Sequence, residues 1–133
     1  MDLFLSFNGR INRAKWWLGL LVLFIAQMVL WFILGSVFGL SAMVSSFDPN
    51  DAASADAMME QMSAMMIPMA ILILVMIYPT LALYAKRWHD RNKSGWWSLI
   101  MFVPIVGAIW MLVELGIMRG TDGANRYGSD PLE

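Results

Sequence analysis

The single histidine of the chain, His89, lies next to Asp90 in a segment rich in arginine and lysine. A histidine beside a carboxylate can act as a general base. Catalysis also needs a nucleophile or a bound cofactor, and the sequence lacks the Gly-x-Ser-x-Gly, Walker A and paired-carboxylate patterns that would indicate one. We therefore expect no catalytic residues. A lipid-linked enzyme that uses His89 and Asp90 is the third of the three functions considered.

Methionine thioethers are the other candidate ligands. Met58, Met62, Met65 and Met69 recur at a spacing that places them on one face of a helix. Soft thioethers suit Cu(I) or Ag(I), but methionine is also a flexible core filler and there are 13 in the chain. With no cysteine and one histidine, no other metal site is expected. We predict no metal and no cofactor, with these four methionines as the alternative.

Long apolar runs make up most of the chain. Hydrophobic residues are 59% and charged residues 14% of the sequence, against about 25% charged in a typical soluble domain. The uncharged run 16–40 would be about 37 Å long as a helix, and a bilayer core is about 30 Å thick. It also exceeds the apolar region of a signal peptide, so we expect it to be retained. We predict an all-α integral membrane protein, a single membrane domain over residues 1–133, with three transmembrane helices at about 16–40, 62–85 and 96–118.

The third run is interrupted by Pro104 and Gly107. A single kinked span would place the carboxyl end outside the cell. A break at Pro104–Gly107 would instead make the segment re-entrant and return the tail to the cytoplasm, which is tolerated only where protein or water satisfies the backbone. We expect three spans and keep the re-entrant form as the alternative. In that alternative Glu114 would return toward the basic segments and pair with arginine or lysine.

Basic residues predict the orientation of the spans. Lysine and arginine near span ends stay on the cytoplasmic side. The segments before the first run and after the second carry seven of them, and the acidic segment 41–60 between these runs has none. The N-terminus and the loop 86–95 are therefore predicted to be cytoplasmic, and the loop 41–60 periplasmic or external. The seven residues are Arg10, Arg13, Lys15, Lys86, Arg87, Arg91 and Lys93.

Two small residues predict a helix-packing face. Gly35 and Gly39 form a small-xxx-small pair in the first run, which permits close approach of another helix. That helix could belong to the same chain or to a second copy, so a homo-oligomer is considered. The net charge of −1 gives no reason to expect nucleic acid as a partner.

Four blocks of sequence resemble a known family. They are the segments Phe7–Arg13 (FNGRINR), Arg87–Trp97 (RWHDRNKSGWW), Pro104–Gly107 (PIVG) and Gly120–Pro131 (GTDGANRYGSDP). In this order they resemble the bacterial inner-membrane proteins called domain of unknown function 805. The acidic, methionine-rich segment 41–66 departs from that pattern. The resemblance implies a small multi-pass protein of the bacterial inner (plasma) membrane and implies no activity.

The family blocks also suggest one polar site. If the segment before the first run, the loop 86–95 and the tail converge, their polar residues would form one face at the cytoplasmic interface, which requires the re-entrant form. We predict a non-enzymatic module whose basic cytoplasmic face binds anionic lipid of the bilayer, a small anion or a partner protein. A small oligomeric transporter or channel subunit is the second function considered. The predicted face comprises Arg10, Arg13, Arg87, His89, Asp90, Arg91, Lys93, Asn125, Arg126 and Asp130.

Overall fold

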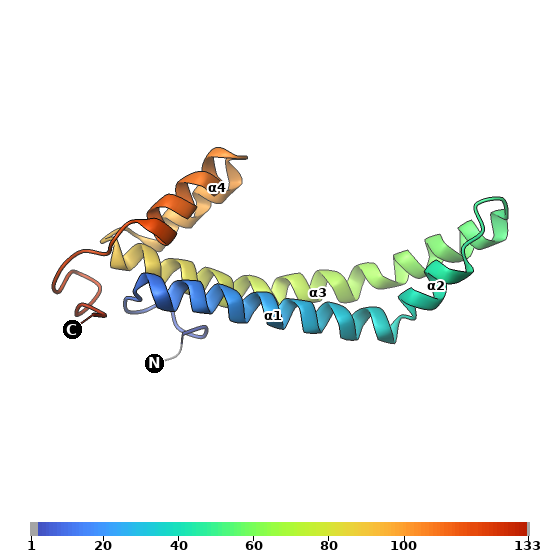
Figure 1. Ribbon diagram of the computed structural model, residues 1–133, viewed down its shortest axis with the longest axis horizontal. Helices are drawn as coiled ribbons and strands as arrows, with labels where there is room; N and C mark the ends of the chain where they lie inside the picture. The colour runs from blue at the N-terminus through green and yellow to red at the C-terminus, as the bar shows by residue number, and fades with distance from the viewer. Residues whose placement is uncertain (1–2, 133) are drawn as a thin grey trace. The chain divides into compact units, whose positions relative to one another are not determined.

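The computed structural model describes residues 3–132, which form helices joined by turns (Figure 1). In chain order the elements are α1 (Arg13–Val37), α2 (Leu40–Ser46), α3 (Ala52–Asp90), η1 (Gly95–Phe102), α4 (Val106–Met111) and η2 (Leu112–Ile117). The short element η1 is a 3-10 helix and η2 is a π-helix. Among the described residues the only β pairing is an isolated bridge between Asn125 and Gly128. The prediction of an all-helical protein is confirmed.

The helices α1 and α3 have the length and composition of transmembrane helices. They contain 25 and 39 residues, and only 6% and 11% of their most apolar stretches is buried. Large apolar side chains such as Phe32 and Ile67 are 77% and 72% exposed. Water strongly disfavours apolar surface on this scale, whereas lipid accepts it. The protein is therefore an α-helical membrane protein with two helices of membrane length.

The chain divides into two compact units, which we describe separately. One contains the described residues of Met1–Leu23 and Ile77–Glu133, and the other contains Phe24–Met76. In the second unit, α1 ends at Val37, and Gly39 adopts a left-handed backbone with φ 63° before α2 begins. Gly35 and Gly39 therefore do not share one helix surface, because the left-handed turn takes Gly39 out of the helix. A Cβ atom at Gly39 would meet nothing within 4 Å.

The first unit has its own buried core. Gly19 of α1 allows Leu83 of α3 to approach closely, because a Cβ at Gly19 would lie 2.5 Å from Leu83 Cδ1. The core side chains come from the segment before α1, from both long helices and from the α4–η2 segment. They are Ile11, Trp16, Leu83, Trp88, Met111 and Leu115.

The predicted third span 96–118 is a broken helix that turns back on itself. Pro104 follows η1, and Ile105 has a positive φ of 63° with ψ −61° in a tight turn, closed by the Val106 N–H donating to the Pro104 carbonyl at 2.6 Å, before α4 starts. Figure 1 shows the two limbs side by side, with the turn at the tip beside the α4 label. They approach so closely that a Cβ at Gly107 would lie 1.9 Å from the Ile100 carbonyl oxygen. Proline at the break and glycine at the contact thus shape a helical hairpin.

Candidate functional site

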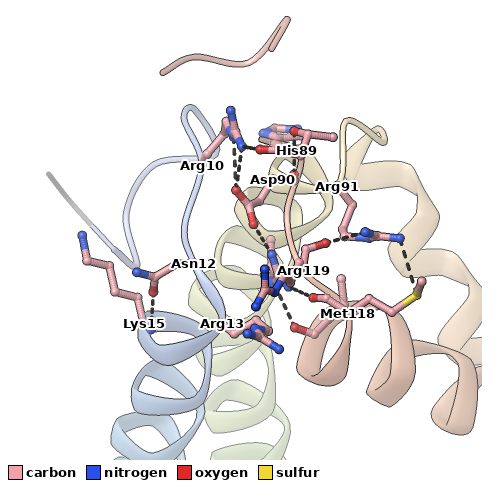
Figure 2. Close-up of polar contacts among 12 residues, drawn as sticks. Arg10, Asn12, Arg13, Lys15, His89, Asp90, Arg91, Met118 and Arg119 are labelled. Carbon is pink, nitrogen blue, oxygen red and sulfur yellow. Dashed lines mark hydrogen bonds and ion pairs between the residues drawn. The ribbon is translucent and has the colours of Figure 1, made fainter. Parts of the chain in front are cut away.

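Arg10 is the buried centre of a polar network at the end of α3 (Figure 2). Its guanidinium donates two hydrogen bonds to the Asp90 carboxylate, at 3.1 Å from Nε and 3.0 Å from Nη2. It also donates to the carbonyls of Thr121 at 2.6 Å, Gly123 at 2.6 Å and Gly128 at 3.3 Å. A planar guanidinium with five N–H donors suits several acceptors at once. One side chain thus joins the segment before α1, the end of α3 and the tail.

Arg87 supplies a second guanidinium to the same carboxylate. It pairs with the other oxygen of Asp90 and donates to the carbonyls of Leu115, at 2.7 Å, and Met118. The side chains of Arg87 and Asp90 are buried, and both residues lie beyond the predicted span 62–85. Burial raises the pKa of the Asp90 carboxyl, and the Arg87 and Arg10 guanidiniums act in the opposite direction. A buried carboxylate needs such pairing to remain ionised, so the two arginines stabilise the fold instead of facing a ligand.

The tail folds tightly against the end of α3. Thr121 donates two hydrogen bonds to the Asp90 carbonyl, from its backbone N–H at 2.8 Å and from its hydroxyl at 3.0 Å. A Cβ at Gly120 would lie 2.1 Å from Oδ2 of Asp90, so only glycine fits here. The Asp130 carboxylate accepts from the Gly123 N–H at 2.9 Å and closes the turn. The turn-rich tail is therefore an ordered part of the network.

Glu114 forms a second cluster of ion pairs. Its carboxylate accepts from Arg91 Nε at 3.0 Å and from Lys93 Nζ at 2.8 Å. Arg91 also donates to the carbonyl of Arg119. Glu114 thus contacts the basic segment, as expected for the form in which the third apolar run turns back.

The His89 ring packs against neighbours other than the Asp90 carboxylate. Its Nδ1 lies 3.2 Å from the Gly9 carbonyl oxygen, and the ring stacks on Tyr127 with centroids 3.9 Å apart. Burial lowers the pKa of His89, and the nearby Arg126 guanidinium acts in the same direction. With Asp90 held by two arginines, the two neighbours in sequence do not form an acid–base pair.

All ten residues of the predicted polar face lie in the first unit, around the end of α3 and the tail. Arg13 donates to the last carbonyl of η2 at 2.7 Å. The Asn125 amide donates to the His89 carbonyl at 2.9 Å. The Arg126 guanidinium is exposed and lies 4.8 Å from the centre of the Tyr127 ring. The structure brings these residues together, but most of them are already engaged with other groups of the chain.

The other predicted residues belong to the second unit. Gly35 lies in α1 and Gly39 in the turn after it, as described above. The four methionines proposed as a metal alternative, Met58, Met62, Met65 and Met69, all lie on α3. Met65 is buried, whereas Met62 is 55% exposed. Metal binding there stays a prediction.

A cavity of about 640 Å³ opens beside the polar network. Its basic residues are Arg13 and Arg119, and Trp17 forms part of the apolar wall. Both arginines are exposed, and within residues 3–132 the Arg119 guanidinium makes no hydrogen bond. Three acidic residues also line the cavity: Asp90 is paired with two arginines, the Asp130 carboxylate accepts from the Gly123 N–H, and Asp122 is exposed. The cavity therefore presents the two exposed guanidinium groups together with the exposed Asp122 carboxylate.

Sequence reasoning missed several residues of this region. Arg119 lines the cavity, and Thr121 fastens the tail to the end of α3. The available signal for Arg119 was its position immediately before the turn-rich block that starts at Gly120.

The fold and its polar end define a small α-helical membrane protein with an ordered ion-pair network beside its apolar helices. A family model described as "Protein of unknown function (DUF805)" matches residues 4–129. The chain belongs to this family, and the resemblance seen in the sequence is confirmed.

Relatives from Escherichia coli (strain K12) agree with this assignment. Inner membrane protein YhaI is 46% identical over 59 residues, which are 44% of this chain and 49% of that protein. The match therefore spans about half the length of that relative. Inner membrane protein YhaH is 26% identical over 96% of this chain and 88% of its own length, and uncharacterized protein YiiR is 27% identical over 94% and 85%. No solved structure matches.

Proposed function

We propose that the protein is a non-enzymatic inner-membrane module that binds the phosphate of an anionic phospholipid head group at its cytoplasmic face. The observation that supports this is the cavity of about 640 Å³ lined by Arg13 and Arg119. Guanidinium groups match phosphate oxygens in charge and geometry. The neighbouring Trp17 is the residue type enriched at the level of lipid head groups.

The proposal includes a re-entrant topology. In it, α1 and α3 span the membrane, and the hairpin from η1 to η2 enters the membrane and returns on the same side. The hydrogen bonds that Arg10 donates to the Thr121 and Gly123 carbonyls support this, because the tail must then share a side with the segment before α1. The excess of lysine and arginine in that segment assigns the side to the cytoplasm.

The topology can be tested with single cysteines, because the chain contains none of its own. We expect a Ser129→Cys variant to resist a membrane-impermeant maleimide in spheroplasts and to react in inverted vesicles. Ser45→Cys, in the loop 41–60, is the control and should show the opposite pattern. Labelling of Ser129→Cys from the outside would refute the re-entrant topology and the shared cytoplasmic site.

The lipid proposal can be tested by titrating the purified protein with short-chain phosphatidylglycerol, phosphatidylcholine and inorganic phosphate. We expect phosphatidylglycerol to bind, and Arg119→Gln to weaken this binding by about tenfold, as for the loss of one charge-assisted hydrogen bond. Lys15→Gln removes an exposed charge outside the cavity and should cost less than about fivefold, the effect of one charge near an anionic surface. Equal losses in the two variants would indicate non-specific attraction. Binding of inorganic phosphate alone would assign the site to a free anion.

A further inference from the structure

A second cavity is lined by residues of α3, of η1 and of the segment before α1, and it shares no lining residue with the proposed head-group site. It has a volume of about 370 Å³ and is walled by apolar side chains such as Phe7, Leu81 and Leu99. Small-molecule sites usually measure about 300–1,000 Å³ and combine apolar walls with a few polar groups. His89, Ser94 and Ser98 are the polar residues of its lining.

Ser98 is the unusual residue of this cavity. Ser98 is 4% exposed, and its hydroxyl has no hydrogen-bond partner within the described chain. A serine in a helix commonly satisfies its hydroxyl by donating to a carbonyl of the preceding turn. An unpaired buried hydroxyl costs free energy, and a hydrogen-bond partner from outside the chain would remove that cost.

His89 contributes a complementary atom to the same cavity. Its Nδ1 faces the Gly9 carbonyl oxygen at 3.2 Å, and a carbonyl only accepts hydrogen bonds, so Nδ1 carries the proton. Burial lowers the pKa of His89, which favours the neutral ring at pH 7. In that ring Nε2 is an acceptor without a proton. It faces Gly95, another residue of the cavity wall, where a Cβ would lie 3.8 Å from it.

We propose that this cavity binds a lipid alcohol, meaning an apolar chain that ends in one hydroxyl group. The ligand hydroxyl would donate to Nε2 of His89 and accept from the hydroxyl of Ser98. A carbonyl or ether oxygen has no proton for Nε2, and a carboxylate has none either. Trp96 and Leu99, which are 78% and 53% exposed, leave the apolar side of the cavity open to a chain arriving from the bilayer.

The lone histidine makes a direct test available. Protein labelled with ¹⁵N-histidine in phosphatidylcholine nanodiscs gives signals from one imidazole ring. We expect 1-dodecanol to move the Nε2 resonance with a saturable dependence on its mole fraction. Dodecyl methyl ether, which has the same chain and no O–H donor, should leave that resonance in place. Equal movement with both compounds, or movement that never saturates, would overturn the proposal.

The variant Ser98→Ala separates binding from folding. Removal of an unpaired buried hydroxyl should leave the stability unchanged or raise it. It should weaken 1-dodecanol binding by about twofold to tenfold, the value of one neutral hydrogen bond. Ser129→Ala, in the tail, is the matched control and should bind as the wild type does. Wild-type affinity in Ser98→Ala, or a clear loss of stability, would contradict the assignment.

The test of 1-dodecanol binding can fail or succeed independently of the test of phosphatidylglycerol binding. Arg119→Gln should leave 1-dodecanol binding unchanged, because Arg119 lines the other cavity. Likewise, Ser98→Ala should leave phosphatidylglycerol binding unchanged.

Discussion

Replacement of Arg10 by methionine removes a buried charge while keeping a side chain of similar length. The variant loses the two hydrogen bonds to Asp90 and the bonds to the carbonyls of Thr121, Gly123 and Gly128. Loss of one partner of a buried ion pair costs about 3–5 kcal/mol. Asp90 retains Arg87, which places the expected loss near the lower end, about 3 kcal/mol. Because three of the acceptors lie in the tail, the loss should appear there as local opening.

The assay is the hydrogen-exchange rate of the Thr121 backbone N–H, which donates to the Asp90 carbonyl in the folded tail, measured in detergent together with denaturation in mixed micelles. A loss of about 3 kcal/mol corresponds to a rise of about 100-fold or more in the open population, since 1.4 kcal/mol is a factor of ten. Arg10→Lys keeps the charge but cannot reproduce the planar fork, so its effect should fall between methionine and wild type. Lys15→Met, an exposed control, should lie within about 0.5 kcal/mol of wild type. If Arg10→Met behaves like Lys15→Met, the network does not hold the tail.

Two further predictions concern the hairpin and the histidine. Gly107→Ala places a Cβ where the Ile100 carbonyl lies 1.9 Å away, so we expect a loss of about 1–3 kcal/mol in mixed-micelle denaturation, whereas Gly35→Ala, with ordinary contacts, should be neutral or stabilising. Burial lowers the pKa of His89 in the folded protein, so as the pH falls the unfolded chain takes up a proton at this histidine before the folded chain does. The free energy of unfolding should therefore keep the full contribution of the neutral ring above pH 6.5 and decrease as the pH drops below that value. Loss of the stacking on Tyr127 should accompany this, and an NMR titration midpoint above 6.5 would refute the reasoning.

The apolar elements were accessible from sequence because lipid imposes a simple rule on them. A run without charge that is long enough to span a bilayer must be a helix, and the predicted spans 16–40 and 62–85 coincide with much of α1 and α3. The third apolar run, 96–118, is also long enough to span a bilayer. Its reversal depends on the positive φ of Ile105, a conformation that a β-branched residue rarely adopts and that its residue type therefore did not suggest.

The polar face was predicted as a set of residues, but their roles were not. Charge and position in the sequence are alike for Arg10 and Arg13, yet Arg10 is buried among acceptors and Arg13 is exposed beside the large cavity. Such a difference depends on which carbonyls the folded tail brings near, which is a property of tertiary structure. Ser98 was missed for the same reason, because a serine within an apolar run looks ordinary until its hydroxyl is seen to lack a partner.

The buried network explains why the tail is rich in turns. Two guanidiniums share one carboxylate, that of Asp90, so one positive charge is left without an ionic partner in a buried site. Backbone carbonyls supply the missing negative potential, because five of them accept hydrogen bonds from Arg10 and Arg87. Two of these belong to the end of η2 and the residue after it, where a helix presents its negative pole. The other three lie in the tail.

A regular helix would use such carbonyls for its own hydrogen bonds, so they can face Arg10 only if the tail is irregular. Gly123 and Gly128 have positive φ angles of 68° and 140°, which glycine adopts without strain and which turn the tail's carbonyls toward the guanidinium. The glycines of the tail and the arginine before α1 thus belong to one hydrogen-bond network, although more than a hundred residues separate them in sequence. Replacement of Gly128 by alanine should therefore loosen the same contacts as loss of Arg10, with a smaller effect because only one acceptor is displaced.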